Sequence, residues 1–321
     1  MSTPFHRAAV YLRHAKSVAV AAHIHPDGDA VGSVLGLTLA LRDAGIAAVP
    51  VLAEESVSPT YSFLPGYGLF MRAADVEVPD VFVALDTTSL ERLGEAEPLA
   101  TGAQTVIDID HHPDNSLFGA VNVVDSNIAS SGQLVWRLIE RLEVSVTHEI
   151  ALCLYVALLT DTGRFQYQNT TPTAFRDAAA MVDAGVDPAE TARLVYQNRA
   201  PEALVLDSRA MSRITLANGG RVAYSFVSQE DFVETGARSE DTENLVDVVR
   251  VLGGIDVAFL VRLLDGEVRV NLRSKTGFDV GAVARELGGG GHAAAAGFTA
   301  VGPLDEIVAS LLVRLPGAGE S

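Results

Sequence analysis

The fold is decided by residues 17–45, SVAVAAHIHPDGDAVGSVLGLTLALRDAG. The stretch begins with SVAVAAH, a short apolar run that is typical of a buried strand. It ends with GSVLGLTLALRDAG, whose length and periodicity predict a helix. Between the two lie His23, Asp27 and Asp29, where the strand ends and the helix begins. A strand followed directly by a helix is the first half of a βαβ unit.

The same alternation of strand-like and helix-like segments continues through the first half of the chain. Strand-like runs occur at 47–54, 80–88 and 105–112, and a helix-like segment follows at 131–142. Apolar strands that alternate with helices predict a parallel sheet that is buried on both faces. We therefore expect an α/β fold whose N-terminal parallel sheet has flanking helices.

The sequence pattern changes in the second half. Helical patterns dominate 147–212, and a helix near 187–209 is expected to carry a domain boundary. Strand-like and helical segments then alternate, at 221–228, 242–252, 256–264, 267–274 and 281–288. A chain of 321 residues is long enough for two domains with separate cores. The expected domains are an α/β domain over 1–187, a helical linker over 188–212 and a smaller α+β domain over 213–321.

Composition restricts the function classes. The net charge of −18 repels long polyanions, which disfavours a protein that coats long nucleic acids. Charged residues, Pro or Gly interrupt every apolar run before the roughly 18 to 20 residues that a membrane span requires. The N-terminal residues show no secretory signal, so we expect a cytoplasmic protein that does not bind membranes. Cys153, the only cysteine, lies in an apolar stretch and is expected to be buried and inert.

Acidic and imidazole side chains cluster where the predicted strands and one helix end. These side chains are His23, Asp27, Asp29, Asp86, Asp110, His111, His112 and Asp161. The carboxyl ends of parallel strands meet at one rim of a sheet, where ligands bind. A single Asp there is more often a helix cap or a turn residue, but an apolar strand has no packing reason to end in Asp-His-His. Carboxylate and imidazole ligands together suit Mn, Zn, Fe or Mg, and a shared carboxylate can bridge two ions about 3.5 to 4 Å apart. The combination predicts a metal site.

A second signal is GGGGHAAAAGF, residues 288–298. Glycines let a backbone approach a ligand closely, and a following helix would add its positive end for a phosphate. The glycines alone are equally consistent with a flexible turn before an Ala-rich helix. NLRSK, residues 271–275, ends a predicted strand with two cations and a hydroxyl, which can receive an anion or stack on a base. Together the two segments predict an anion-binding element in the second domain.

Four motifs, in this order, resemble those of the DHH phosphoesterase superfamily: HIHPDGDAVGS (23–33), VALDTT (83–88), DIDHHPDN (108–115) and LLTDTGRFQYQNTT (158–171). NLRSK and GGGGHAAAAGF resemble the DHH-associated substrate domain that accompanies this family. The resemblance covers nearly the whole chain and makes 1–187 the phosphoesterase domain and 213–321 the substrate-binding domain. Within the superfamily, the chain is most similar to the members that act on short oligonucleotides, on 3′-phosphoadenosine 5′-phosphate or on linear and cyclic di-AMP.

The resemblance implies a role for each candidate residue. One ion would be held by His23, Asp27 and Asp86, and a second by Asp29, Asp86, His111 and Asp161. His112 would face the substrate phosphate and Asp110 would orient the histidine pair, so that His112, Asp110 and Asp86 form the catalytic set. The substrate contacts in the second domain would be Arg273, Ser274, Gly289, Gly290, Gly291 and His292. The chain departs from the family pattern at Asn271, Arg164 and Asp108.

The activity that the resemblance implies is hydrolysis of short oligonucleotides (nanoRNA, pApA) to nucleoside 5′-monophosphates, and removal of the 3′-phosphate of adenosine 3′,5′-bisphosphate. Water activated by two divalent ions would be the nucleophile, with Mn²⁺ expected and Mg²⁺ or Co²⁺ as alternatives. The expected partners are short RNA and nucleotides, with a second copy of the chain in a homodimer. A cyclic dinucleotide phosphodiesterase is the main alternative. A manganese inorganic pyrophosphatase, which lacks the GGGGH ending, and a non-catalytic nucleotide-binding regulator are further alternatives.

Overall fold

The computed structural model describes residues 3–242, 245–264 and 266–318. The chain divides into two compact units, Met1–Asn198 and Arg199–Ser321. In the described residues, each unit has a six-stranded sheet and its own hydrophobic core. Across those ranges, every helix falls short of the length and apolar character needed to span a bilayer. The predicted α/β fold with a smaller α+β domain is confirmed.

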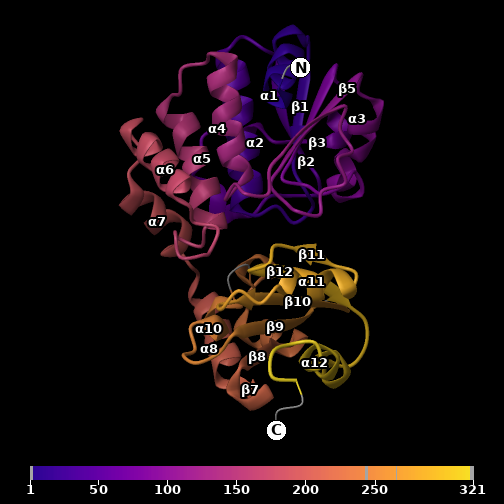
Figure 1. Ribbon diagram of the computed structural model, residues 1–321, viewed down its shortest axis with the longest axis vertical. Helices are drawn as coiled ribbons and strands as arrows, with labels where there is room; N and C mark the ends of the chain where they lie inside the picture. Colours follow the sequence, from indigo (N-terminus) through magenta and orange to yellow (C-terminus); the bar gives the residue numbers. More distant parts are fainter. Residues whose placement is uncertain (1–2, 243–244, 265, 319–321) are drawn as a thin grey trace. The chain divides into compact units, whose positions relative to one another are not determined.

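The sheet of the N-terminal unit is parallel at every strand pair described (Figure 1). Its order is β3 (Met71–Arg72), β2 (Ala48–Leu52), β1 (Val18–Ala21), β4 (Val81–Leu85), β5 (Thr105–Asp110) and β6 (Val121–Val124). All residues of β1 and β4 are buried, as a sheet covered on both faces requires. The direction of strand order reverses between β1 and β4. Ligands of such sheets bind at this switch point, outside the carboxyl ends of the strands.

Helices cover both faces of this sheet. One face packs against α1 (Pro4–His14), α2 (Gly28–Asp43) and α4 (Ser131–Leu142), and the other against η4 (Glu91–Ala96) and α3 (Glu97–Gly102). Helix α5 (His148–Asp161) packs on α2 and α4, as Figure 1 shows, and is followed by α6 (Pro172–Asp183) and α7 (Pro188–Tyr196). Helix α2 is therefore enclosed between the sheet and α5.

Three glycines at four-residue spacing allow α2 and α5 to pack closely. A Cβ added to Gly32 would lie 2.3 Å from the carbonyl oxygen of Cys153, well inside van der Waals contact. A Cβ on Gly28 would lie 2.5 Å from the side chain of Thr160, and one on Gly36 would lie 2.6 Å from Leu154. The two helices run in opposite directions, so the first turn of α2 lies beside the last turn of α5.

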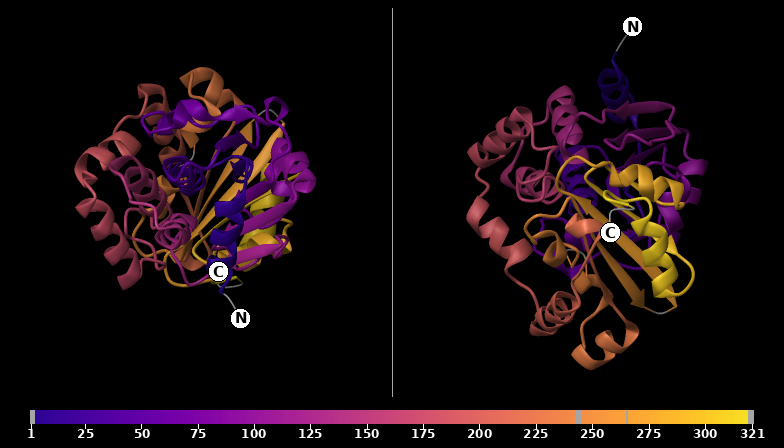
Figure 2. Two further views of the ribbon diagram at one scale, coloured as in Figure 1. Left: turned by 90° about the horizontal axis from the view of Figure 1, so that it is seen from above. Right: turned by 60° about the horizontal axis from the view of Figure 1, so that its bottom comes forward.

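The sheet of the C-terminal unit is mixed. Its order is β11 (Gly290–Gly291), β12 (Ala295–Ala300), β10 (Glu267–Ser274), β9 (Val257–Leu264), β8 (Val222–Val227) and β7 (Thr215–Ala217). Strands β8 and β9 pair in parallel and the other described pairs are antiparallel. Helices α11 (Val280–Glu286) and α12 (Leu304–Leu312) pack on one face, and α12 is seen against the strands in the right-hand view of Figure 2. The other face packs against α8 (Pro201–Ser212), α9 (Gln229–Thr235) and α10 (Asp247–Arg250).

Three predicted helices differ from the structure. The helix expected at 242–252 is shorter in the described residues, where α10 spans Asp247–Arg250, and residues 243–244 lie outside those residues. The boundary helix is in fact two helices, α7 and α8, with residues 197–200 between them. The Ala-rich segment after the glycine cluster forms β12 instead of a helix. A Cβ on Gly289 would lie 2.2 Å from the carbonyl oxygen of Gly297, so the glycines let the chain pack against β12 and pair with it. Several elements were not predicted, among them strands β3 and β6 and helices α1, α9 and α12.

Candidate metal centre

The candidate ligands of the N-terminal unit lie at the switch point of its sheet. His23 follows β1 by two residues, Asp86 follows β4 directly, and Asp110 is the last residue of β5. The backbone of Asp86 has a φ of 54°, which turns the chain sharply at the end of β4. His23, Asp86 and Asp110 are buried. The sheet therefore delivers three polar side chains to one buried rim, as the sequence predicts.

The first group of ligand atoms comes from His23, Asp27 and Asp86. One ligand atom from each lies within 4.8 Å of the others, and His23 Nε2 is 3.5 Å from Asp86 Oδ2. The ring is oriented by its other nitrogen, since His23 Nδ1 is 2.7 Å from the carbonyl oxygen of Ile24. Asp27 also caps α2, because its Oδ1 accepts hydrogen bonds from two backbone N–H groups. The capping role that is common for such an Asp thus exists beside the candidate ligand role.

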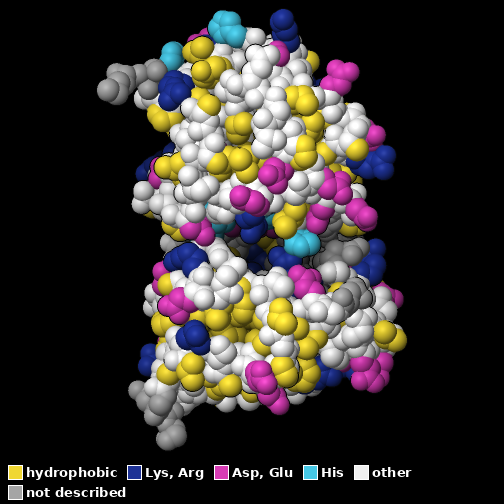
Figure 3. Space-filling view, turned by 90° about the vertical axis from the view of Figure 1, so that its right-hand side faces the viewer, with side chains coloured by type: hydrophobic (Ala, Val, Ile, Leu, Met, Phe, Trp, Pro, Cys, Tyr) yellow, Lys and Arg dark blue, Asp and Glu magenta, His cyan; other side chains and the backbone are white. Residues whose placement is uncertain are grey.

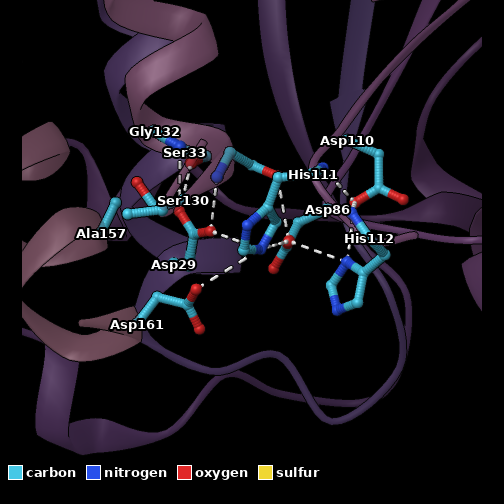
Figure 4. A network of polar contacts seen from close by, with 12 residues as sticks. Asp29, Ser33, Asp86, Asp110, His111, His112, Ser130, Gly132, Ala157 and Asp161 are labelled. Atoms are coloured by element: carbon cyan, nitrogen blue, oxygen red, sulfur yellow. Dashed lines mark hydrogen bonds and ion pairs between the residues drawn. The ribbon is translucent and has the colours of Figure 1, made fainter. Parts of the chain in front are cut away.

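The second group surrounds His111 (Figure 4). His111 Nε2 lies 3.5 Å from Asp29 Oδ2, 3.5 Å from Asp86 Oδ1 and 3.5 Å from Asp161 Oδ2. These separations are long for hydrogen bonds. Two ligands that each bind one ion at about 2.0 to 2.2 Å lie roughly 3 to 3.5 Å apart, so the spacing suits a shared cation. Asp161 Oδ2 is buried and has no hydrogen-bond partner. Buried carboxylate oxygens normally have a partner, and a metal ion would provide one here.

Asp29 is anchored by the first turn of α4. Its Oδ1 accepts hydrogen bonds from the Ser33 hydroxyl at 3.0 Å and from the Gly132 backbone N–H at 3.0 Å, and its Oδ2 accepts one from Ser131 N–H at 2.6 Å. The Ser131 hydroxyl in turn donates to Asp86 Oδ1 at 3.0 Å. One residue therefore fixes both central carboxylates. Sequence reasoning missed Ser131, since two serines and a glycine before a helix are typical of an ordinary cap.

The buried carboxylates have divergent pKa values. Burial raises the pKa of Asp29 well above its usual range, and the Asp86 charge raises it further. Burial also disfavours the Asp86 charge, but the adjacent His111 and His23 rings outweigh burial and hold the pKa of Asp86 well below its usual range. Burial and the neighbouring carboxylates raise the pKa of Asp161 to about 7. Without an ion, protons on Asp29 and Asp161 reduce the negative charge of the centre. A bound cation would balance that charge instead, so ion binding would release these protons.

A hydrogen-bonded chain holds His112 beside this centre. His112 Nδ1 is 2.8 Å from Asp110 Oδ1, and Asp110 Oδ2 accepts a 2.8 Å hydrogen bond from the Asn115 amide. The same amide group lies 3.3 Å from Asp108 Oδ1. Burial and the nearby Asp110 raise the pKa of Asp108 to about 8, which favours its protonated form near neutral pH. Asp110 thus contacts His112, while its role in orienting the histidine pair stays a prediction, and Asn115 is a further contact that the sequence did not indicate.

Replacing Ser131 with alanine is expected to weaken the centre without unfolding the chain. The hydroxyl contacts Asp86 directly, whereas the backbone N–H that serves Asp29 remains. Loss of such an outer hydrogen bond to a ligand typically lowers metal affinity by about 10- to 100-fold. Titration of the Ser131→Ala variant with Mn²⁺ checks this, with Ser62→Ala as an exposed serine control. Equal affinity in the two variants would contradict the role of Ser131.

The predicted substrate residues gather at one end of β10 in the C-terminal unit. Ser274 N–H donates to the carbonyl oxygen of Ala294 at 2.8 Å, in the turn that follows His292. Arg273 pairs in register with Ala295 at the start of β12. The Ser274 hydroxyl and Arg273 Nε are buried without hydrogen-bond partners. Both are donors that could form a hydrogen bond to an anion. Gly290 and Gly291 form β11 beside this turn.

The fold and the site define a metal-dependent α/β phosphoesterase. Residues 17–158 match the DHH family N-terminal domain, and residues 219–312 match the DHHA1 domain. The chain belongs to the DHH family.

Two relatives support this assignment, and one solved structure shares the fold. The bifunctional oligoribonuclease and PAP phosphatase NrnA of Thermus thermophilus is 35% identical over 298 residues, covering 88% of this chain and 84% of the relative. The protein of the same name from Bacillus subtilis is 27% identical over 86% of each chain. The crystal structure of an exopolyphosphatase-related protein from Bacteroides fragilis has the same fold, with a TM-score of 0.85, 23% identity, and coverage of 96% of this chain and 94% of that one.

Proposed function

We propose that the chain hydrolyses very short oligonucleotides to nucleoside 5′-monophosphates and removes the 3′-phosphate of adenosine 3′,5′-bisphosphate. The observation that carries the chemistry is the position of Asp86, whose two oxygens face two separate ligand groups. Its Oδ2 lies 3.5 Å from His23 Nε2 and its Oδ1 lies 3.5 Å from His111 Nε2. A carboxylate shared in this way is the core of a two-ion phosphoesterase. The names of the Thermus and Bacillus relatives support the substrate class.

The side chains present fit divalent cations. The two groups offer carboxylate oxygens and imidazole nitrogens and contain no sulfur, and we propose Mn²⁺ as the ion. Ions bound there would supply water activation at neutral pH and charge neutralisation at the phosphoryl oxygens. Asp29, Asp86 and Asp161 provide the negative charge that holds them.

His112 is the side chain that we assign to the substrate phosphate. Burial lowers the pKa of His112, but the hydrogen bond with Asp110 outweighs burial, so the pKa is raised. The ring therefore tends to keep its proton near neutral pH, with Nδ1 facing Asp110, and a positively charged ring suits a phosphate oxygen. Asp110 fixes the orientation of the ring and stabilises its positive charge.

Charge supports a preference for short substrates. The net charge of −18 repels a long polyanion more strongly than a dinucleotide. On the face shown in Figure 3, the Lys and Arg side chains of the described residues lie singly or in small groups among apolar and acidic ones. Recognition of a long single strand favours a continuous basic groove. Assembly as a homodimer and a cytoplasmic location stay predictions.

Product analysis with a matched set of substrates tests the proposal. The set contains pApA, a long single-stranded RNA, adenosine 3′,5′-bisphosphate, cyclic di-AMP and pyrophosphate, each with Mn²⁺. We expect pApA to give monophosphate at least about tenfold faster than the long RNA is degraded, a difference of about 1.4 kcal/mol in the activation barrier. Fastest turnover of cyclic di-AMP would move the assignment to a cyclic dinucleotide phosphodiesterase. Fastest turnover of pyrophosphate would overturn the substrate class.

A further inference from the structure

Both polar groups of the peptide unit between Ile24 and His25 form hydrogen bonds. Its carbonyl oxygen lies 2.7 Å from His23 Nδ1, and its N–H donates to Glu54 Oε1 at 3.0 Å. A peptide unit is planar, so the position of one end sets the position of the other. Glu54 is therefore connected to the His23 ring through a single rigid group.

The second carboxylate oxygen of Glu54 holds the same segment from another side. Glu54 Oε2 lies 3.1 Å from His25 Nδ1. His25 has a φ of 56°, a left-handed conformation that is uncommon for residues other than glycine. Such a conformation persists only when surrounding contacts fix it. The two oxygens of Glu54 contact the backbone and the ring of this residue, which stands between the candidate ligands His23 and Asp27.

We propose that Glu54 is a positioning residue for the metal centre and acts on His23 through the Ile24–His25 peptide. Donation from His23 Nδ1 to a fixed carbonyl leaves the Nε2 lone pair pointing at the ion, and it selects one tautomer. The inference rests on the proposed two-ion site, which it extends by a residue on β2's exit loop. Histidine ligands commonly donate to a carboxylate or a carbonyl, and here a carboxylate and a peptide act in series.

Hydrogen bonds in series polarise one another. The hydrogen bond that the side-chain oxygen of Glu54 accepts from the peptide N–H polarises the peptide, which makes the Ile24 carbonyl a better acceptor for the imidazole N–H. A stronger acceptor at Nδ1 raises the basicity of Nε2 towards a cation. The side chain of Glu54 is 29% exposed and that of His25 is 51% exposed, so the ion pair between them contributes little to stability by itself. The hydrogen bond from the His25 N–H to Glu54, rather than the ion pair with the His25 ring, is the contact that affects His23 and the metal centre.

Mn²⁺ titration of the full-length chain, followed by electron paramagnetic resonance of the free ion, tests the proposal. We expect the wild-type chain to bind two ions and Glu54→Ala to weaken one of the two sites by about 10- to 100-fold. Glu54→Gln should stay within a few-fold of wild type, because the amide oxygen still accepts from the His25 N–H. Glu55→Ala is the matched control, an exposed neighbouring acid that should bind like wild type.

Each other outcome has a definite meaning. If Glu54→Gln binds as weakly as Glu54→Ala, the charge of Glu54 and not its hydrogen bond matters, and the proposal is wrong. Wild-type affinity in Glu54→Ala overturns it as well. Absence of any bound ion in the wild-type chain would instead overturn the proposed metal site.

A second variant separates the peptide contact from the ring contact and protects the test against misfolding of Glu54→Ala. His25→Gly removes the ring, suits the left-handed backbone and keeps the N–H that Glu54 accepts from. It should retain Mn²⁺ affinity within a few-fold of wild type. A loss as large as the loss expected for Glu54→Ala would assign the effect to the ring and reject the peptide connection.

Discussion

Replacement of Asp86 with asparagine is expected to abolish turnover and to remove both of the ion sites that we propose. The carboxylate contacts both ligand groups, with Oδ2 towards His23 and Oδ1 towards His111. An asparagine keeps the shape but offers one weaker oxygen, and its NH₂ group repels a cation. Loss of several kcal/mol of charge stabilisation corresponds to a decrease in kcat of about 10³-fold or more.

The Asp86→Asn experiment requires a measurement that the variant is folded and a control variant at an acidic residue outside the centre. Far-UV circular dichroism should be unchanged, while Mn²⁺ titration should show both sites weakened together. Asp75→Asn, which removes an exposed carboxylate paired with Arg72, should behave like wild type in both assays. Two tight sites in Asp86→Asn would show that the ions do not share this residue.

Replacement of Gly32 with alanine is expected to destabilise the N-terminal unit, although alanine normally favours a helix. The exchange stabilises an exposed helix interior by about 1 kcal/mol. Here the new methyl group would lie 2.3 Å from the Cys153 carbonyl oxygen, which is backbone and cannot rotate away. Overpacking of this kind costs about 1 to 3 kcal/mol, and α2 and α5 must move apart.

Because α2 begins beside the end of α5, the same movement separates Asp29 from Asp161. We therefore expect Gly32→Ala to weaken the ion site around His111 as well as to lower the midpoint of urea unfolding. Trp136, the only tryptophan, lies in α4 and reports on the N-terminal unit by fluorescence. Gly68→Ala is the control, since its added Cβ meets no atom within 4 Å. Equal midpoints for the two variants would show that the helix contact is not tight in solution.

The sequence pattern alone indicates which polar side chains lie together at the rim of the N-terminal sheet. An apolar run that ends in a polar residue, such as 81–86 or 105–112, marks the carboxyl end of a buried strand. Parallel strands then place these ends at one rim, whatever their distance in the chain. Asp161 was placed by the motif that surrounds it, and the helix contact at Gly28 explains why it reaches the same rim.

What could not be predicted depends on contacts between segments distant in sequence. Glu54 ends the strand-like run 47–54 in the same way that Asp86 ends its own, but only the structure shows its oxygen on the His25 N–H. The segment after Gly291 has helical composition and still forms β12, because β10 offers it a complete edge of backbone partners. Local propensity yields to tertiary pairing in such cases.

The position of Asp161 at the end of α5 has a consequence for the order of assembly during synthesis. His23 is the first candidate ligand made and Asp161 the last, so a nascent chain that has not yet produced α5 cannot complete the centre. The six ligands that the sequence analysis proposes, His23, Asp27, Asp29, Asp86, His111 and Asp161, all belong to the unit Met1–Asn198. Cation binding could thus stabilise the first domain once α5 has left the ribosome, before the second domain has been made.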